Sequence, residues 1–468
     1  MLTHARTKIV CTLGPASSDP ATIRALVDAG MNVARINFSH GTHAQHDAVI
    51  ATVRAIAQEA GKPVAILADL QGPRIRIGDL PAPLDVAPES EHVFVPEAHA
   101  RGDDIPVTYD DIARDVKVGG RILVNDGLLE FRVVALDGER VRVRTVYGGR
   151  LTSHKGMNLP GTDVTAPSLT DKDRDDIAFA AAHDVAYVAL SFVRRPEDIA
   201  GLRALLPRGI LIVAKIEKDS AVDRIEDILR VADAVMVARG DLGVELPFER
   251  VPLEQKRIIA LAQRFGRPVI TATQMLESMV DNPRPTRAEA NDVANAVLDG
   301  TDAVMLSAET ASGHYPELAV RAMHRIAVAA ETAPVPRGVG LDRLEPGKAT
   351  IEETIASAAV TAVRVIGARC VIVFTKSGFS ARIVAGRRPA VPIVVLTDQE
   401  RTWRQLALVW GVAPFLVPHC DTYEQMAARA REVVVREAIA VPGDRVVITA
   451  GVPFDVPGST NTLKVETI

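Results

Sequence analysis

The chain alternates between short apolar runs and amphipathic stretches of helical period over most of its length. Eight runs rich in β-branched residues are predicted to be strands, at residues 7–13, 32–39, 63–70, 185–193, 210–217, 234–241, 268–275 and 303–310. Each run is nearly continuous in apolar residues, which is typical of parallel strands covered on both faces. Amphipathic helices separate most of them, and one has a capping box of Thr286 and Glu289 and ends at Gly300. The pattern predicts a (β/α)8 barrel.

Between the third and fourth predicted strands the pattern of residues changes. Residues 73–161 contain several Pro and Gly, and apolar residues alternate with polar ones on both sides of a turn at Asp137 and Gly138. We expect an inserted all-β domain above the carboxyl ends of the barrel strands, where it would act as a lid. The alternative is an insertion that has no role in function. Residues 1–72 and 162–335 then form the barrel.

A polar, Pro-containing stretch at residues 333–350 reads as a linker, and an α/β pattern restarts after it. A helix is predicted over 351–366, and further helices alternate with apolar strands such as CVIVFT and PIVVLT. Residues 350–468 are therefore expected to form a separate open α/β domain.

Composition narrows the class of protein. The 468 residues are 47% hydrophobic and 24% charged, as in ordinary globular proteins, and the net charge of −5 argues against coating nucleic acid or a membrane surface. No apolar run approaches the roughly 18 residues needed to span a bilayer, and the first residues lack the apolar core of a signal peptide. Three widely separated cysteines exclude a disulfide framework or a cysteine-rich zinc site, so we expect a cytoplasmic protein.

Three charged residues suggest chemistry at the ends of neighbouring strands. Lys215 and Glu217 are two apart in an apolar run and project to one side of a strand, and Asp241 ends the next run. Two carboxylates and one ammonium group can hold a divalent cation beside a fixed positive charge, which suits a phosphorylated anion as substrate. An ordinary surface salt bridge is the alternative.

Polar residues gather at the ends of the other predicted strands as well. They are Arg35, Asn37, Ser39 and His40; Asp69, with Arg74 and Arg76 just beyond it; Thr273 and Gln274; and Ser307, Glu309 and Thr310. Barrel enzymes build their active sites where the carboxyl ends of the strands form a rim. The joint placement of these residues on one carboxyl-end rim favours a catalytic site over scattered structural polar groups.

The strings ARINFSHG, AKIEK, MVARGDLGVE, TATQMLESM, PTRAEANDVANAVLDG and MLSAET resemble those of the pyruvate kinase family. The resemblance runs through the barrel, the insertion and the C-terminal domain. It implies transfer of a phosphoryl group from phosphoenolpyruvate to ADP, with Mg²⁺ or Mn²⁺, giving pyruvate and ATP.

The resemblance also implies roles for the rim residues. Glu217 and Asp241 would hold the divalent cation. Lys215 and Arg35 would bind the transferred phosphoryl group, with Arg76 as a further cation. Thr273 and Ser307 would position or relay the proton that reaches the enolate, since neither hydroxyl has a suitable pKa to donate alone.

Two further sets of ligands follow from the resemblance. The backbone N–H groups expected to bind the substrate carboxylate, in the manner of an anion nest, are those of Ala238, Arg239 and Gly240. The residues expected to bind the nucleotide are Asn37, His40, Arg76 and Arg195. Members of the family often carry a lysine where this chain has Arg195, so the charge is kept.

One departure bears on the monovalent cation. Many members of the family need K⁺, whose ligands map onto Asn37, Ser39, Asp69 and the carbonyl of Leu70. The next segment reads DLQGPRIR here and DTKGPEIR in those enzymes, so Arg74 replaces a glutamate. A guanidinium group there can supply the missing charge and would repel K⁺. We predict activity without K⁺; the alternative is that Arg74 points into solvent and K⁺ still binds.

The segment TKSGFSA follows an apolar strand and leads into a helix, and it resembles the allosteric phosphate loop of the family. Its predicted ligands are Thr375, Lys376, Ser377 and Ser380. The loop GVPFDVPGSTNT lacks the arginine with which some relatives grip fructose 1,6-bisphosphate, so we expect a monophosphate such as AMP, ribose 5-phosphate or glucose 6-phosphate. A purely structural turn is the alternative.

Two other functions would use part of the same residue set. A Mg²⁺-dependent barrel lyase acting on 2-oxo acids would need the Lys–Glu–Asp trio but neither a nucleotide lid nor the cluster of arginines. A metabolite-sensing scaffold would be favoured by lost catalytic groups, and none is lost here. A tetramer is expected from the family alone.

Overall fold

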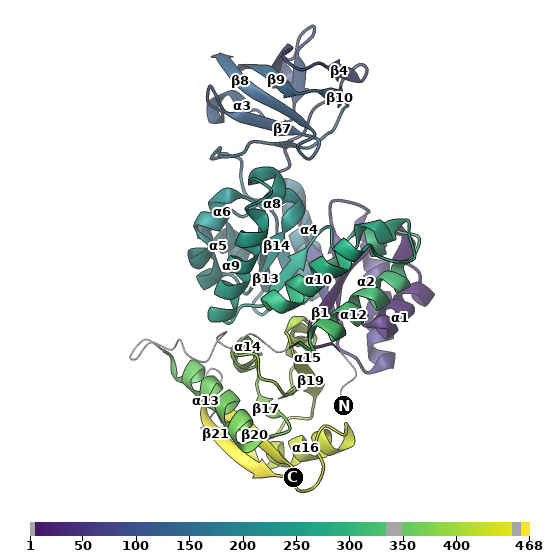
Figure 1. The fold of residues 1–468 in the computed structure, drawn as a ribbon, viewed down its shortest axis with the longest axis vertical. Coiled ribbons are helices and arrows are strands. Elements are labelled where there is room, and N and C mark those ends of the chain that lie inside the picture. The colour runs from purple at the N-terminus through teal and green to yellow at the C-terminus, as the bar shows by residue number, and fades with distance from the viewer. Residues whose placement is uncertain (1–4, 334–348, 452–459) are drawn as a thin grey trace.

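The computed structural model describes residues 5–333, 349–451 and 460–468. Three parts follow one another along its long axis: an inserted β domain, a barrel in the middle and a C-terminal α/β domain (Figure 1). Most of the predicted linker at 333–350 and most of the loop GVPFDVPGSTNT lie outside the described residues.

Eight parallel strands close the barrel, so the predicted (β/α)8 fold is confirmed. In chain order they are β1 (Lys8–Leu13), β2 (Val33–Asn37), β3 (Ala65–Asp69), β12 (Tyr187–Leu190), β13 (Leu211–Ile216), β14 (Ala234–Ala238), β15 (Val269–Ala272) and β16 (Ala303–Leu306). The first strand pairs with both the second and the last, which closes the ring. Side chains such as Leu67 and Met236 fill the interior, while those on the outer faces pack against the helices.

Helices surround the barrel on its outside. They are α1 (Pro20–Ala29), α2 (His43–Ala60), α4 (Asp171–Ala182), α5 (Pro196–Leu205), α6 (Asp219–Asp223), α7 (Ile225–Val231), α8 (Arg239–Glu245), α9 (Val251–Arg264), α10 (Arg287–Asp299), α11 (Ala308–Ala311) and α12 (Pro316–Ala330). Short 3-10 turns lie at Pro15–Ser17 and Glu277–Val280. In the described part of the chain no helix is both long and apolar enough to cross a membrane.

Several predicted strands are too long at their carboxyl ends. The expectation that Asp241 ends a strand is wrong: β14 stops at Ala238, and Asp241 lies in the first turn of α8. The last ladder pair between β14 and β15 joins Ala238 to Ala272, so the backbone beyond has no strand partner and turns into a helix. In the same way β16 stops at Leu306, and Glu309 and Thr310 belong to α11.

The capping box predicted for α10 is present. The Thr286 hydroxyl accepts from the Glu289 backbone N–H, and the Glu289 carboxylate accepts from the Thr286 backbone. The same carboxylate also accepts from the backbone N–H of Ser278, 2.7 Å away, and so joins the helix to the preceding turn. Burial raises the pKa of Glu289, but the hydrogen bonds from Ser278 and Thr286 outweigh it and hold that pKa below its usual value.

Replacing Thr286 with alanine is expected to lower the stability of the barrel by about 1 kcal/mol, because the cap at an orphan N–H is lost. Thermal unfolding of the two proteins measures the change. Thr52→Ala is the matched control, since that exposed hydroxyl only bonds to the carbonyl of Ala48 within α2. Equal melting temperatures for the two variants would contradict the role of the cap.

The insertion between β3 and α4 is an all-β unit. Its elements are β4 (Leu84–Val86), β5 (Glu91–Pro96), β6 (Ile105–Val107), α3 (Ile112–Asp115), β7 (Arg121–Val124), β8 (Leu129–Asp137), β9 (Arg140–Tyr147), β10 (Gly149–Leu151) and β11 (Met157–Asn158), with a 3-10 turn at Glu97–His99. Six strands form one sheet, and β4 pairs with β10. The turn predicted at Asp137 and Gly138 joins β8 to β9, and Gly138 has the positive φ of 57° that such a turn requires.

The C-terminal part is the expected open α/β domain. Its sheet has the order β19-β18-β17-β20-β21, with β21 antiparallel to its neighbour. The elements are α13 (Ile351–Ile366), β17 (Val371–Phe374), α14 (Phe379–Gly386), β18 (Ile393–Thr397), α15 (Glu400–Gln405), a 3-10 turn at Leu406–Leu408, β19 (Val412–Leu416), α16 (Tyr423–Arg436), β20 (Arg445–Gly451) and β21 (Thr460–Thr467).

This domain closes the amino-terminal end of the barrel (Figure 1). Ala407 and Leu408 belong to the same buried cluster as the side chains inside the barrel. The Tyr187 hydroxyl at the start of β12 donates to the Gln405 carbonyl, 2.6 Å away. Arg388 forms an ion pair of 3.0 Å with Asp302, next to β16, and lies over the Trp410 ring. The domain is therefore attached by apolar, polar and ionic contacts at the end opposite the carboxyl-end rim.

Candidate active site

Lys215 is the centre of a buried charge cluster on the carboxyl-end rim. Its Nζ lies 2.9 Å from Glu217 Oε1 and 3.3 Å from Asp69 Oδ1, and it donates to Ser191 Oγ at 2.7 Å. The period-2 spacing at the end of β13 therefore places Lys215 and Glu217 on one side, as a strand requires. Three strands, β3, β12 and β13, meet at this ammonium group.

The cluster keeps its ammonium charged. Burial lowers the pKa of Lys215, but Asp69 and Glu217 outweigh burial and raise that pKa above its usual value. Burial raises the pKa of Asp69, and Lys215 together with Arg35 more than reverses this, so its pKa is lowered. The site thus presents a permanent positive charge whose own counter-charges are fixed in the barrel wall.

Two carboxylates of the cluster suit a divalent cation. Glu217 Oε2 accepts from the backbone N–H of Phe192 at 2.7 Å, which orients the carboxylate. Burial raises the pKa of Glu217; Lys215 opposes this rise and the charge of Asp241 adds to it, so the pKa lies above its usual value. The negative charges of Glu217 and Asp241 repel each other. A divalent cation with oxygen ligands would relieve this repulsion, so the donor set fits Mg²⁺ or Mn²⁺.

Arg35, in the middle of β2, lies beside this cluster. Its Nε donates to Asp69 Oδ2 at 2.6 Å, and one terminal nitrogen donates to the Thr12 hydroxyl at 2.9 Å. These bonds fix the plane of the guanidinium group, because both ends of the fork are held by buried strands. A fixed, planar cation is suited to bind a phosphoryl group.

Thr273 and Gln274 occupy a strained turn after β15. Both have positive φ, 67° and 54°, which is uncommon for residues with a side chain. The Thr273 hydroxyl accepts from the Gly240 backbone N–H at 2.7 Å, and the Arg239 guanidinium donates to the Thr273 carbonyl at 2.7 Å. Arg239 also pairs with Asp292 of α10. The side chain of Arg239 therefore secures the strained turn from the neighbouring strand.

Ser307 follows β16 across the rim. Its backbone N–H donates to Glu309 Oε2 at 2.6 Å, and the other oxygen of Glu309 accepts from the Leu276 N–H at 3.0 Å. Glu309 is fully buried, so this carboxylate joins the Thr273 turn to the Ser307 turn. The Thr310 hydroxyl donates to the Thr12 carbonyl, which links the last strand end to the first.

The predicted monovalent-cation ligands lie where β2 and β3 end. Asn37 Oδ1 accepts from the Ser39 backbone N–H at 3.1 Å, and the Leu70 carbonyl accepts from the Ser191 hydroxyl at 2.7 Å. Both oxygens of Asp69 face cations, Arg35 and Lys215. The Arg74 side chain is exposed to solvent and adjoins Arg76, whose pKa burial and Arg74 lower.

The remaining nucleotide-site candidates are spread around the rim. His40 is exposed after β2, and Arg195 caps α5 with its guanidinium near Asp198. Arg76 belongs to the inserted domain and donates to the His154 carbonyl at 2.9 Å. The structure therefore places Arg76 on a different part of the molecule from Arg35 and Lys215, whereas the sequence grouped all three on the carboxyl-end rim.

The insertion touches the barrel at one corner of the rim. Asn158 of β11 donates to Glu245 Oε1 of α8 at 3.1 Å, and the Lys218 ammonium pairs with the same carboxylate. Arg194 donates to the Ala166 carbonyl in the segment that returns from the insertion. A charge next to Glu217, the expected metal ligand, is thus connected to the inserted domain.

The predicted effector loop begins α14. The Thr375 hydroxyl accepts from the Gly378 N–H at 2.9 Å, and Lys376 pairs with Asp398 at 3.1 Å. The Ser377 hydroxyl is exposed, whereas that of Ser380 is buried against Thr460 of β21. Burial raises the pKa of Asp398, but hydrogen bonds from His419, Gln399 and Lys376 outweigh it and lower that pKa to about 2.

Two side chains of the cluster were not among the sequence candidates. Ser191 directly follows β12 and bridges Lys215 to the Leu70 carbonyl, and Thr12 in β1 holds Arg35. The signal was present, because both residues are polar and stand at or near the end of an apolar strand run. Applying the strand-end rule to all eight strands would have found them.

Comparisons with known proteins agree with this geometry. The family profile "Pyruvate kinase, barrel domain" matches residues 4–320, and "Pyruvate kinase, alpha/beta domain" matches residues 353–466. The pyruvate kinases of Staphylococcus haemolyticus and Geobacillus stearothermophilus are each 45% identical, over 99% of this chain and 80% of the relative. The crystal structure of a pyruvate kinase from Cryptosporidium parvum aligns with a TM-score of 0.93 and 33% identity, covering 99% of this chain and 96% of that one. With the barrel, the charge cluster and both domains accounted for, the chain belongs to the pyruvate kinase family and is a phosphotransferase enzyme.

Proposed function

We propose that this enzyme transfers the phosphoryl group of phosphoenolpyruvate to ADP with the help of Mg²⁺ or Mn²⁺, giving pyruvate and ATP in glycolysis. The observation that carries the proposal is the buried cluster around Lys215, in which one fixed ammonium group stands between two carboxylates. Phosphoryl transfer depends mainly on positioning and on stabilising charge at the phosphoryl oxygens. The cluster supplies both.

Glu217 and Asp241 are the proposed metal ligands, and the bound ion would neutralise charge on the phosphoryl and carboxylate oxygens of the substrate. The Phe192 N–H keeps Glu217 in place, and α8 carries Asp241 in its first turn. Two protein carboxylates would leave the other positions of the ion to water and substrate oxygens, as is usual for Mg²⁺ in phosphoryl transfer.

Lys215 and Arg35 are the proposed phosphoryl-binding cations. Arg35 offers its planar fork to the phosphoryl group, while Lys215 offsets charge on the equatorial oxygens as the bond breaks. Arg76 is a third cation on the inserted domain, and movement of that domain over the rim would bring it to the phosphates. Asn37, His40 and Arg195 are the proposed contacts to the nucleotide.

Thr273 and Ser307 are assigned to the protonation of the enolate. Their hydroxyls position or relay a proton and do not supply it alone, since their pKa values are far too high. The proposed site for the substrate carboxylate is the backbone from Ala238 to Gly240, at the start of α8. The Gly240 N–H donates a hydrogen bond to Thr273 Oγ1. The proposed carboxylate site and the proposed proton relay would therefore be in direct contact.

We further propose that the enzyme does not require K⁺. The support is that the Asp69 carboxylate has two cationic neighbours and the Leu70 carbonyl already accepts from Ser191. Arg74 is exposed to solvent, as the alternative expected, so in this proposal it acts through its charge and not through a direct contact with these ligands. A further monovalent cation would meet repulsion rather than an unbalanced carboxylate.

ATP formation from phosphoenolpyruvate and ADP with Mg²⁺ tests both proposals at once. In buffer free of K⁺ the enzyme should be fully active, and added K⁺ should change kcat by less than about twofold. Arg74→Glu should instead create a dependence on K⁺, because it restores the negative charge. Activity of the unaltered enzyme only with K⁺ would keep the phosphoryl transfer and refute the role of Arg74; no turnover under any condition would refute the transfer itself.

The loop from Thr375 to Ser380 is the proposed site of a phosphorylated activator, a sugar monophosphate or AMP. The start of α14 presents N–H groups, and Lys376 supplies a cation. The pairing of Lys376 with Asp398 means that a bound phosphate would compete with that carboxylate. An activator would therefore bind more tightly if Asp398 were neutral.

Lys376→Ala is expected to weaken activation by glucose 6-phosphate or AMP about tenfold to a hundredfold, the usual contribution of a charged hydrogen bond. Asp398→Asn should strengthen it, and Lys464→Ala, an exposed lysine of the same domain, should leave it unchanged. Activation curves of the three variants measure the effect. Unaltered activation of Lys376→Ala by every sugar phosphate tested, and by AMP, would refute the site.

We place the enzyme in the cytoplasm, where its nucleotide substrate is made and where the three free, buried cysteines would stay reduced. A homotetramer is proposed from family membership, and sedimentation of the purified protein tests it.

A further inference from the structure

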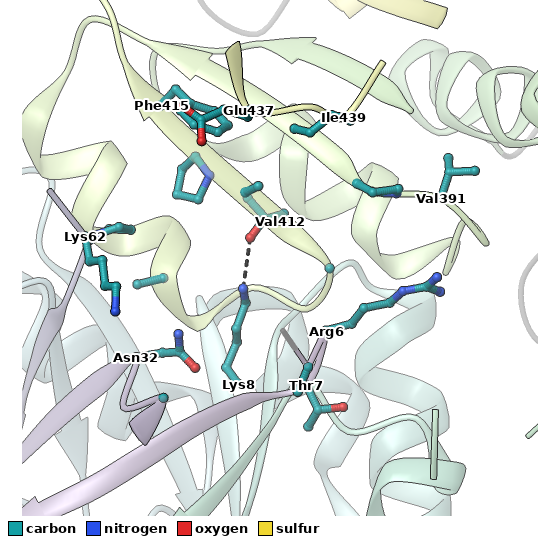
Figure 2. A pocket seen from close by; sticks show the side chains of 18 of the residues that line it. Arg6, Thr7, Lys8, Asn32, Lys62, Val391, Val412, Phe415, Glu437 and Ile439 are labelled. Carbon is teal, nitrogen blue, oxygen red and sulfur yellow. Dashed lines mark hydrogen bonds between the residues drawn. The ribbon is translucent and has the colours of Figure 1, made fainter. Parts of the chain in front are cut away.

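A cavity of about 1860 Å³ lies between the amino-terminal end of the barrel and the C-terminal domain, as Figure 2 shows. Lys8, Asn32 and Lys62 line it from the starts of barrel strands and the end of α2. Val412, Phe415 and Ile439 line it from the C-terminal domain. It lies at the opposite end of the strands from the carboxyl-end rim, and the loop from Thr375 to Ser380 does not line it.

The lining of this interdomain cavity is strongly basic. Ten of its residues are lysine or arginine, and two, Asp28 and Glu437, are acidic. Each acid already has a neighbouring cation, at 3.6 Å and 2.9 Å. Within the described ranges the structure records no ion pair for Arg325 or Arg364, both of which are exposed. These two guanidinium groups can therefore receive an anion from solvent.

Lys8 extends from β1 into the cavity (Figure 2). Its Nζ donates to the Val412 carbonyl at 2.9 Å, and the residue is 9% exposed. No ion pair to Lys8 is recorded in the described part of the chain. The two carboxylates whose charges act on Lys8 have other partners: Glu331 accepts from the backbone of Arg6 and Thr7, and Asp302 pairs with Arg388. The amine thus has one weak neutral partner and no counter-ion of its own.

These surroundings favour a neutral, nucleophilic amine. Burial lowers the pKa of Lys8 to about 8, and the charges of Glu331 and Asp302 offset burial only in part. At pH 7.5 about a quarter of such amines are neutral, compared with about a thousandth for an ordinary lysine. A neutral amine still has an N–H to donate to Val412 and keeps its lone pair for reaction.

We propose that Lys8 is a covalent modification site, acylated by small acyl phosphates that the basic interdomain cavity concentrates through their phosphate group. The neutral Nζ attacks the acyl carbon; an N–C bond forms and the bond from that carbon to the phosphate oxygen breaks. The phosphate leaves with the electron pair and takes up the proton that the nitrogen loses. The product is an amide and inorganic phosphate, and no oxidant or reductant is needed.

Both ends of such a reagent match the cavity. Arg325 and Arg364 suit the phosphate, since guanidinium groups bind it through two parallel hydrogen bonds. The apolar side chains of Val391 and Ile439 also line this cavity and can accommodate the acyl group. The amide N–H can still donate to Val412, so the modification removes a charge from the barrel–domain junction without removing its hydrogen bond.

Incubation of the complete enzyme with acetyl phosphate, followed by peptide mass spectrometry, tests the proposal. Lys8 should be acetylated at least about tenfold faster than Lys62, the exposed lysine of the same cavity, because burial lowers the pKa of Lys8. The rate at Lys8 should level off above about pH 8. Lys8→Arg removes the labelled peptide. Equal or slower labelling of Lys8 would overturn the proposal.

A second comparison tests the role of the cavity charge. The double variant Arg325→Glu/Arg364→Glu should slow acetylation of Lys8 by acetyl phosphate about tenfold or more, and leave its reaction with uncharged acetic anhydride unchanged. Both side chains are exposed, so the fold should persist, which a thermal melt checks. Equal slowing with both reagents would show changed access rather than lost attraction, and would overturn the recruitment of phosphate by this cavity.

Discussion

Replacing Lys215 with methionine is expected to lower kcat roughly a thousandfold, the upper end of what a single preorganised charge contributes to catalysis. The reason is that Nζ lies within 3.3 Å of both Asp69 and Glu217, so no other cation in the cluster can take its position. Because the pKa of Lys215 is raised above its ordinary value, the ammonium group stays charged at every pH at which the enzyme is assayed. The activity of the unaltered enzyme should accordingly show no loss due to Lys215 until about pH 10 or above.

Steady-state kinetics at saturating Mg²⁺ measure this loss. Lys172→Met is the matched control, since that lysine also pairs with a buried carboxylate, Asp176, but lies outside the cluster. Circular dichroism should show that both variants are folded. A Lys215→Met enzyme within tenfold of the unaltered rate would contradict the proposed role, whereas an unfolded one would call for Lys215→Arg, which keeps the charge and alters its position.

The second large effect concerns the attachment of the C-terminal domain. Arg388→Met should destabilise the junction by about 3–5 kcal/mol, because it leaves the buried Asp302 carboxylate without its partner. The two side chains are 5% and 6% exposed and 3.0 Å apart. Asp302 also accepts from the Val269 and Trp410 backbones, so its charge cannot turn away into solvent.

Intrinsic fluorescence is a direct probe of this junction, because both tryptophans of the chain lie there. Trp403 lines the interdomain cavity, and the Trp410 ring lies under Arg388. The denaturant midpoint reported by tryptophan should fall in Arg388→Met and recover in part in Arg388→Met/Asp302→Asn, which removes the unpaired charge. Arg369→Met, at an exposed ion pair, should change it little. A double variant that is no more stable than the single one would contradict the ion-pair argument.

The strands and the charge cluster followed from local patterns. Continuous apolar runs predicted all eight barrel strands, and the two-residue spacing of Lys215 and Glu217 placed both side chains at one point. Their ends were less predictable, because a strand stops where its neighbour stops. Nothing in the run AVMVARGD distinguishes Ala238 from Asp241; the end of β15 at Ala272 does.

Contacts between distant segments could not be predicted from local patterns in the sequence. The positive φ of Thr273 and the clamp by Arg239 depend on which groups surround the turn, and Thr273 carries no glycine signal. Equally, the expectation for Arg74 rested on its charge, while its exposure depends on the direction of the chain as it leaves the barrel. The pairing of Lys376 with Asp398 joins residues that lie 22 positions apart, just beyond the ends of β17 and β18.

The closure of the barrel by Ala407 and Leu408 has a consequence for synthesis on the ribosome. The last barrel helix ends at Ala330, yet the interior cluster is complete only when Leu408 has been added, 78 residues later. At about 5–20 residues per second this interval lasts roughly 4–16 s. During that time the nascent barrel has its helices and strands, but the apolar side chains around Leu67 and Tyr187 are not yet covered by Ala407 and Leu408. These uncovered side chains are the surface that a chaperone would bind.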